Sequence, residues 1–281
     1  MNVNHFRNSL LNGLTPLYGE PEAAAIYRCV VDYLSRNTII PANANEDWPD
    51  ETSRLAESIR NSLLQGIPLQ YVLQESWFDG RPFYVDDSVL IPRPETEELL
   101  DWIRKEESSR SHPIRILEIG TGSAILSISL KRAFPQSQIT AIDISEKALA
   151  VAEKNAQRFG ESIELLKMDF IDKINWEKLS EYDLIVSNPP YIPLSEKATL
   201  PDWVTLHEPS IALFVGDEDP LIFYRLMISF AEDHLGAGGR IYAELHEDMA
   251  GRVRELFRQM GLETQVKRDM QNKDRMICAW K

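Results

Sequence analysis

The chain has 281 residues, 43% of them hydrophobic, which is enough for one large or two ordinary domains with a well-buried core. Its 44 acidic and 30 basic residues give a formal net charge of −14, and this balance disfavours extended contact with a phosphate backbone, although a local basic groove stays possible. No apolar run approaches the roughly 18 to 20 residues that a bilayer span needs, and residues 1–5 show no export signal. We therefore expect a cytoplasmic, monomeric protein with a protein partner, no membrane association and no stable nucleic-acid binding.

Residues 1–75 have the pattern of a small helical domain. Ile26, Val30, Val31 and Leu34 recur at helical spacing, and Gly66 to Pro68 closes a later helical segment. Cys29 and Cys278 lie far apart inside apolar patterns, so we expect two buried thiols and no metal site.

Residues 76–92 alternate around Asp79-Gly80, a pair that favours a tight turn, and predict a β-hairpin linker. From residue 93 to 281 strand and helix patterns alternate, which predicts a mostly parallel sheet of about seven strands. The expected elements are strands at 114–119, 139–142, 163–166, 184–186, 240–244, 264–266 and 276–280, with helices from about Ser123 and across 146–159.

A glycine-rich turn follows the first of these strands. Gly120 and Gly122 allow the backbone to turn tightly and a ligand to approach closely, which favours a nucleotide-like cofactor. Asp143, 23 residues after Gly120, ends the next strand and can accept hydrogen bonds from both hydroxyls of a ribose. Its other possible role, capping the next helix, suits Ser145 better. Asp169 and Phe170 follow the third strand and offer an acceptor and a stacking ring for adenine.

The segment Asn188-Pro189-Pro190-Tyr191 directly follows the apolar strand at 184–186. Two prolines fix two φ angles and bias Asn188 towards an extended conformation, so the carbonyls and the Asn188 amide are held in place. Acceptors held in this way suit a planar NH2 group, because they favour its pyramidalisation as the nitrogen attacks. Asn-Pro is also an ordinary loop signal. Its position after a strand, 68 residues beyond Gly120, favours N-methylation with S-adenosylmethionine over hydride transfer with NAD.

Four segments, 66–71, 90–97, 120–123 and 188–192, together resemble the HemK/PrmC family of protein-(glutamine-N5) methyltransferases. The resemblance implies a Rossmann-like class I methyltransferase fold preceded by a helical substrate-recognition domain. It further implies methylation of the glutamine in the Gly-Gly-Gln motif of class 1 peptide chain release factors with S-adenosylmethionine. Ala124 and Gln74 stand where this family usually has glycine.

The resemblance also implies roles for single residues. The cofactor's methionine and ribose would lie against Gly120, Thr121, Gly122, Ser123 and Ala124, its ribose hydroxyls on Asp143, and its adenine at Phe170. Asp169, proposed above as an acceptor for adenine, and Asn188 complete the expected cofactor-binding set. Asn188 and the backbone of Pro189 would hold the substrate amide, with Pro190 and Tyr191 completing the substrate site and Tyr191 against the glutamine stem. Arg93 and Glu95 have no assigned role, and a salt bridge by which Arg93 braces the junction between the domains is at least as well supported as substrate contact.

Other functions fit the same chemistry. One alternative is a nucleic-acid amino methyltransferase, whose adenine or cytosine substrate presents an equivalent NH2 group. Another is a ribosomal-protein glutamine methyltransferase, which shares both cofactor and target atom. A cofactor-binding adaptor without activity is the non-enzymatic alternative.

Overall fold

The computed structural model describes residues 1–43, 45–110 and 112–281 and divides the chain into two compact units, Met1–Glu75 and Ser76–Lys281. The smaller unit has its own hydrophobic core, and the larger unit has two. Within the described residues, none of the helices combines the length and apolar character that crossing a membrane requires.

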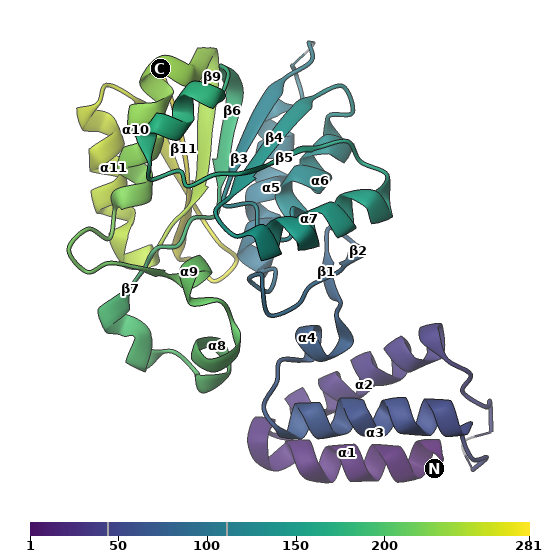
Figure 1. Ribbon diagram of the computed structural model, residues 1–281. Helices are drawn as coiled ribbons and strands as arrows, with labels where there is room; N and C mark the ends of the chain where they lie inside the picture. Colours follow the sequence, from purple (N-terminus) through teal and green to yellow (C-terminus); the bar gives the residue numbers. More distant parts are fainter. Residues whose placement is uncertain (44, 111) are drawn as a thin grey trace. The chain divides into compact units, whose positions relative to one another are not determined.

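The smaller unit is helical, as predicted. It consists of α1 (Val3–Tyr18), α2 (Glu20–Asn37), α3 (Asp50–Leu64) and the short α4 (Leu69–Leu73) (Figure 1). Ile26, Val30 and Leu34 form the buried stripe of α2, one helical turn apart, and pack into the core of this unit. Cys29 lies beside this stripe and is exposed, so the expectation of two buried thiols was wrong for Cys29 and right for Cys278.

The predicted hairpin is present at the start of the larger unit. Strands β1 (Ser76–Phe78) and β2 (Arg81–Phe83) pair in antiparallel register, and both residues of the turn, Asp79 and Gly80, have positive φ. The Asp79 carboxylate pairs with both terminal nitrogens of Arg104, at 2.7 and 2.6 Å, on helix α5 (Pro94–Glu107). The Asp79 N–H donates to Glu97 on the same helix, at 2.7 Å, so α5 holds the hairpin turn.

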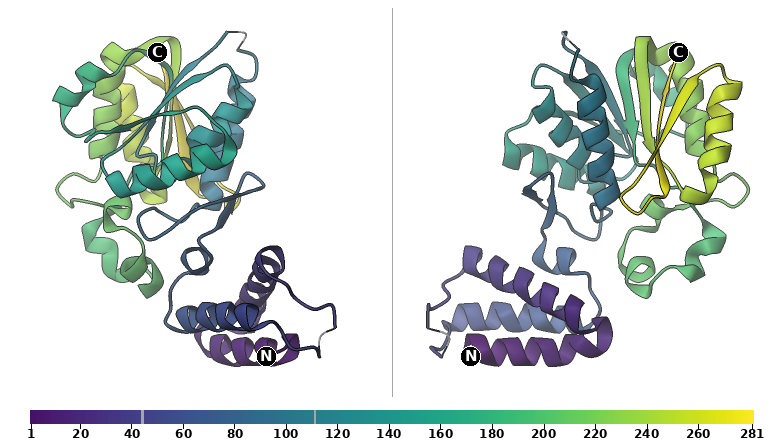
Figure 2. Two further views of the ribbon diagram at one scale, coloured as in Figure 1. Left: turned by 45° about the vertical axis from the view of Figure 1, so that its right-hand side comes forward. Right: turned by 180° about the vertical axis from the view of Figure 1, so that it is seen from behind.

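The larger unit contains a seven-stranded sheet in the order β10-β11-β9-β6-β3-β4-β5 (Figures 1 and 2). The strands are β3 (Arg115–Ile119), β4 (Gln138–Asp143), β5 (Glu164–Lys167), β6 (Tyr182–Ser187), β9 (Leu235–Glu244), β10 (Glu263–Arg268) and β11 (Asp274–Trp280). β11 runs antiparallel to both of its neighbours and the other pairs are parallel. The expected seven-stranded, mostly parallel sheet is therefore confirmed.

Helices cover both faces of this sheet, as Figure 2 shows. One face carries α5, α6 (Ile125–Ala133) and α7 (Glu146–Phe159), and the other carries α10 (Ile222–His234) and α11 (Ala250–Gln259). Successive strand residues alternate between the two cores: Ile116 and Leu184 pack with the first group of helices, whereas Leu117 and Ile185 pack with the second. Strands buried on both faces explain the near-continuous apolar runs of the sequence.

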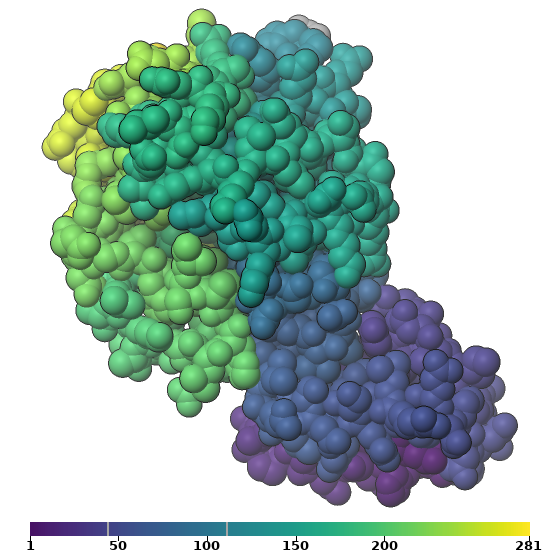
Figure 3. All heavy atoms as spheres, viewed as in Figure 1, coloured from purple at the N-terminus to yellow at the C-terminus, as the bar shows by residue number. Residues whose placement is uncertain are grey.

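Several short elements complete the larger unit: η1 (Lys173–Lys178), β7 (Ile192–Pro193), η2 (Leu194–Thr199), α8 (Asp202–His207), α9 (Ser210–Leu213), β8 (Phe214–Val215) and η3 (Glu247–Met249). The stretch from β7 to β8 lies on the surface of the unit (green in Figure 3). Pro193, Pro201 and Pro209 each directly precede one of its helical turns, where a fixed φ and a missing N–H carry no penalty.

Gln74 ends α4 in the left-handed conformation, with φ of 51°. A residue other than glycine in this conformation costs roughly 1–2 kcal/mol of stability. Glycine avoids this cost, but its greater freedom in the unfolded chain offsets part of the gain. We expect Gln74→Gly to raise the free energy of unfolding by about 0.5–1 kcal/mol in urea denaturation. Asn272→Gly is the matched control. Asn272, with φ of 64°, is a residue type that tolerates this conformation, and its side chain accepts a hydrogen bond from Arg268, so no gain is expected. A loss of stability in Gln74→Gly would contradict this account.

Candidate functional site

The register of the sheet brings the two sequence motifs together. In the parallel pair β3–β6, Ile119 lies opposite Ser187, and the Ser187 hydroxyl donates to the Ile119 carbonyl at 2.8 Å. The next residues, Gly120 and Asn188, therefore leave neighbouring strands side by side at the carboxyl edge of the sheet. One pocket in the larger unit is lined by the glycine turn, by the end of β4 and by the Asn188 corner.

The glycine turn has the conformation that its sequence requires. Gly120 and Gly122 have φ of 72° and 54°, and the N–H groups of Gly120 and Thr121 both donate to the Ile142 carbonyl on β4. Ala124 also adopts a left-handed conformation, with φ of 61°, and its methyl group is fully buried in the core under α6. Residues 120–123 line the pocket, whereas Ala124 packs beneath it.

Asp143 lies at the pocket wall, at the end of β4. One carboxylate oxygen accepts from the Gly122 N–H and the other from the Ser145 N–H, both at 2.9 Å. Ser145 caps α7 through its hydroxyl, as predicted. Burial raises the pKa of Asp143 against the lowering effect of these bonds. Its two oxygens offer about four lone pairs, and the N–H groups of Gly122, Ser145 and Ile144 take at most three, so the carboxylate can still accept from a ligand donor.

Asp169 and Phe170 also line the pocket. The Asp169 carboxylate accepts from the Ile171 N–H at 2.9 Å. The Phe170 side chain is only 4% exposed and packs against Trp176 and Phe230, with ring centroids 5.3 and 5.6 Å away. Most of its ring therefore belongs to the core, which leaves stacking on a ligand as a prediction.

Sequence reasoning missed two apolar side chains at this pocket. Ile144 and Ile171 are 44% and 46% exposed, and each directly follows a residue that we had singled out, Asp143 and Phe170. Exposed aliphatic groups beside a pocket offer flat faces to an aromatic ring. The available signal was an isoleucine just beyond the end of a strand pattern, where polar turn residues are usual.

Glu118 is a third residue at this pocket that sequence reasoning missed. Its side chain is buried at the pocket, where one carboxylate oxygen accepts from the Thr121 hydroxyl at 2.7 Å and from the Ser127 N–H at 3.1 Å. The Ser127 hydroxyl donates to the same oxygen. Burial raises the pKa of Glu118 to about 7, although these hydrogen bonds act in the opposite direction. Glu118 thus takes an N–H group from the first turn of α6.

The Asn188 corner is held by hydrogen bonds from both of its ends. The Asn188 Nδ2 donates to the Thr96 hydroxyl on α5 at 3.1 Å, and the Tyr191 hydroxyl donates to Glu244 Oε1 at 3.0 Å. Asn188, Pro189 and Pro190 line the pocket, and Tyr191 extends to Glu244 at the end of β9. Burial raises the pKa of the Tyr191 hydroxyl well above its ordinary value.

Arg93 forms a salt bridge at 2.6 Å with Glu208, whose side chain has no exposed surface. The other oxygen of Glu208 accepts from the Ile91 N–H at 3.1 Å. Arg93 and Glu208 therefore tie the segment before α5 to the segment before α9. Both residues belong to the larger unit, so this salt bridge is internal to that unit, and a bracing role at the junction between domains stays a prediction. Arg93 also lines the pocket.

Comparison with known proteins decides the family. A model described as "Methyltransferase small domain" matches residues 96–200. A release factor glutamine methyltransferase from Flavobacterium psychrophilum is 35% identical over 285 residues, which cover 99% of this chain and 98% of the relative. One from Bacteroides thetaiotaomicron is 39% identical over 230 residues, 80% of each chain. The chain belongs to the release factor glutamine methyltransferase family. The resemblance stated from the sequence is thereby confirmed.

Solved structures support the fold of this family member. A methyltransferase from Pyrococcus furiosus has a TM-score of 0.52 at 16% identity, covering 83% of this chain and 98% of that one. The hMettl16 catalytic domain in complex with MAT2A 3′UTR hairpin 6 has a TM-score of 0.57 at 16% identity, covering 89% and 91%. At such identities the likeness shows the fold alone. The chain is a methyltransferase with the expected class I fold.

The raised pKa of Glu118 predicts a pH-dependent stability. Between its ordinary value of 4.5 and about 7, folded Glu118 holds its proton more often than unfolded Glu118, so its contribution to the free energy of unfolding falls as pH rises. Glu118→Gln removes this fall. We expect the stability of the variant relative to the unsubstituted protein to improve from about pH 5 to about pH 7.5 in urea titrations. Glu153→Gln on the outer face of α7 is the control. An equal pH dependence in both variants would contradict the prediction.

Proposed function

We propose that this methyltransferase transfers a methyl group from S-adenosylmethionine to the side-chain amide nitrogen, N5, of the glutamine in the Gly-Gly-Gln motif of class 1 peptide chain release factors. The observation that carries the proposal is the placement of the Asn188-Pro189-Pro190 corner and the glycine turn on one pocket, in a chain whose relatives are named release factor glutamine methyltransferases. The neutral amide needs acceptors for its two hydrogens, and the Asn188 side chain and the Pro189 carbonyl would supply them.

The charge of the pocket supports a cationic cofactor. Glu118, Asp143 and Asp169 contribute carboxylates to its wall, and these suit the sulfonium and ammonium groups of S-adenosylmethionine. A dinucleotide requires a pyrophosphate at the free N-terminus of the helix. In this chain Glu118 accepts the Ser127 N–H of that helix, so a phosphate would meet a carboxylate there.

The residues that would hold S-adenosylmethionine follow from their places on the pocket. Residues 120–123 would contact its methionine and ribose, Asp143 its ribose hydroxyls, and Asp169 and Phe170 its adenine, between the aliphatic faces of Ile144 and Ile171. When bound, S-adenosylmethionine supplies an electrophilic methyl group.

Asn188 and Pro189 would position the substrate glutamine. The Asn188 Nδ2 is engaged by Thr96, so its Oδ1 is the atom left to accept one amide hydrogen, and the Pro189 carbonyl would accept the other. Holding both hydrogens orients the nitrogen lone pair for attack and favours its pyramidal form. No general base is assigned, because the proton on the methylated nitrogen can leave to water after transfer.

The direct test incubates the purified protein and labelled S-adenosylmethionine with a class 1 release factor, and maps the labelled residue by mass spectrometry. Label on the glutamine of Gly-Gly-Gln, and its loss when that glutamine is replaced by alanine, is the expected result. Ribosomal proteins and RNA are the parallel substrates. Preferred labelling of either would replace the proposal with the corresponding alternative function.

Asn188→Ala should slow turnover while leaving cofactor affinity nearly unchanged. Loss of an acceptor that acts in the transition state lowers kcat by about 30- to 900-fold, which corresponds to roughly 2–4 kcal/mol. Steady-state kinetics with saturating release factor would measure kcat, and calorimetry would measure the Kd for the cofactor. Unchanged kcat would remove Asn188 from the reaction.

Asp143→Ala should have the opposite effect to Asn188→Ala, and lower the affinity for the cofactor more than kcat. Loss of two charge-assisted hydrogen bonds to the ribose weakens cofactor binding by about tenfold or more, whereas kcat at saturating cofactor changes less. Isothermal calorimetry with S-adenosylmethionine measures the effect. Glu153→Ala, an exposed acidic residue on α7 away from this pocket, controls for the loss of one negative charge. Equal affinity in both variants would exclude Asp143 from the ribose site.

A further inference from the structure

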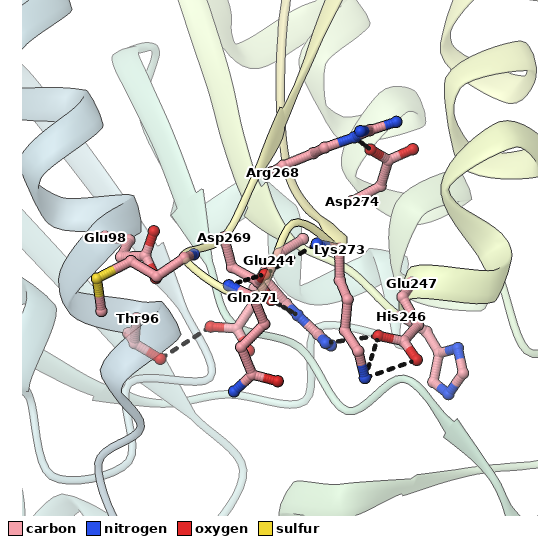
Figure 4. Close-up of polar contacts among 12 residues, drawn as sticks. Thr96, Glu98, Glu244, His246, Glu247, Arg268, Asp269, Gln271, Lys273 and Asp274 are labelled. Atoms are coloured by element: carbon pink, nitrogen blue, oxygen red, sulfur yellow. Dashed lines mark hydrogen bonds and ion pairs between the residues drawn. The ribbon is translucent and has the colours of Figure 1, made fainter.

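One buried carboxylate is connected to both ends of the Asn188 corner. Glu244 ends β9, and its side chain is fully buried. Its Oε2 accepts from the Thr96 hydroxyl at 2.8 Å, the contact drawn in Figure 4, and its Oε1 accepts from the Tyr191 hydroxyl at 3.0 Å. Thr96 in turn accepts from Asn188 Nδ2 at 3.1 Å. These contacts join α5, the Asn188 corner and β9, which are far apart in the sequence.

The direction of each hydrogen bond follows from the chemistry of the carboxylate. An ionised carboxylate only accepts, so the Thr96 O–H must point to Glu244. Thr96 then has only lone pairs to offer, and Asn188 must face it with its NH2 group. The Asn188 Oδ1 consequently turns away from Thr96. Reversing the amide would set Oδ1 against the Thr96 oxygen with no hydrogen between them, an arrangement that costs the whole bond.

We infer that Thr96 and Glu244 are positioning residues for methyl transfer, which orient the Asn188 amide so that its Oδ1 accepts from the substrate NH2 group. The inference rests on the proposed function, because it presumes that Asn188 holds the substrate amide. Glu244 acts indirectly: it orients the Thr96 hydroxyl, and Thr96 orients the Asn188 amide. Its second bond holds Tyr191 and with it the far end of the two prolines.

Glu244 must be ionised to perform this role, and its burial and the groups around it set its pKa. Burial is the largest effect on the pKa of Glu244 and raises it to about 6, against the lowering effect of the hydrogen bonds from Thr96 and Tyr191. The charge of Arg275 on β11 also lowers this pKa, and that of Glu95 on α5 raises it. Arg275 is itself paired with Asp269 and Glu247 at 3.1 Å each, and Glu247 also binds Lys273 (Figure 4). On the remaining sides lie the Tyr191 hydroxyl and, on α10, the Tyr224 hydroxyl, which donates to the Glu244 backbone carbonyl at 2.9 Å. The centroid of the His246 ring lies 6.1 Å from the centroid of the Tyr191 ring.

Protonation of Glu244 should therefore disturb the corner. A carboxylic acid carries one O–H donor, so it can no longer accept on both oxygens in the same way, and either Thr96 or Tyr191 must turn. If the Thr96 O–H turns towards Asn188, the Asn188 amide can reverse, so that its Oδ1 accepts from Thr96 and no longer faces the substrate. The rate of methyl transfer should fall as pH decreases through about 6.

Three variants test the inference by single-turnover rates with saturating cofactor and release factor. Thr96→Val removes the hydroxyl and keeps the shape of the side chain, whereas Thr96→Ser keeps the hydroxyl. Glu244→Gln keeps the shape but replaces a group that only accepts with an amide that both donates and accepts, so the Thr96 hydroxyl is no longer held in one direction. We expect Thr96→Val and Glu244→Gln to lower the rate about tenfold or more, and Thr96→Ser to stay within about threefold of the unsubstituted protein. The KM for release factor and the Kd for cofactor should change by less than about twofold.

The pH profile separates positioning from packing. The decline in rate near pH 6 should be present in the unsubstituted protein and in Thr96→Ser, and absent in Glu244→Gln, whose slow rate should not vary there. Persistence of the same decline in Glu244→Gln would overturn the inference, as would equal losses in Thr96→Ser and Thr96→Val. If Glu244→Gln does not fold, the comparison of the two Thr96 variants decides alone.

Failure of the proposed function has a different signature. If the unsubstituted protein transfers no methyl group to the glutamine of a release factor, the proposed function itself is wrong. If it does so, and Asn188→Ala is slow while Thr96→Val and Glu244→Gln react at the unsubstituted rate, only the positioning role of Thr96 and Glu244 is wrong.

Discussion

The parallel register between β3 and β6 is the constraint on which the site depends. Ile119 and Ser187 are opposite each other and joined by a side-chain hydrogen bond, so the chain leaves both strands at the same level. The glycine turn follows one strand and the Asn188 corner follows the other. A slip of one residue in either strand would move every side chain of that strand to the opposite core, which the apolar surfaces on both faces forbid. The hydrophobic pattern of two strands thus sets the distance between the two motifs.

Buried carboxylates give this pocket its second property. Glu118 and Glu244 are both fully buried; hydroxyl and amide donors bind one oxygen of Glu118, and hydroxyl donors bind both oxygens of Glu244. Burial makes their ionised forms less favourable, so the fold gives up stability in order to keep negative charge and directed acceptors in this region. A loss of stability of this kind is typical of a functional site, because apolar side chains of the same shape would stabilise the fold at least as well.

Much of this arrangement was accessible from the sequence, and the remainder was not, for physical reasons. Strands and α7 follow local periodicity, and the glycine turn and the two prolines impose their own backbone geometry wherever they occur. Thr96 and Glu244 are 148 positions apart, and no local pattern relates them. Phe170 looked like a ligand-stacking ring, but whether an aromatic side chain faces a ligand or the core depends on packing against Trp176 and Phe230, which tertiary structure alone decides. The segment from β7 to β8 consists of turns too short to carry a period.

The two outermost strands of the sheet have a consequence for the protein in a crowded solution. β5 begins and ends with Glu164 and Lys167, and β10 begins with Glu263 and ends with Lys267 and Arg268. If an extended segment of another chain paired with either edge strand, its side chains would lie beside charged groups at both ends of that strand. Self-association by strand addition is therefore disfavoured at both edges, and the seven-stranded sheet can remain open without becoming a template for aggregation.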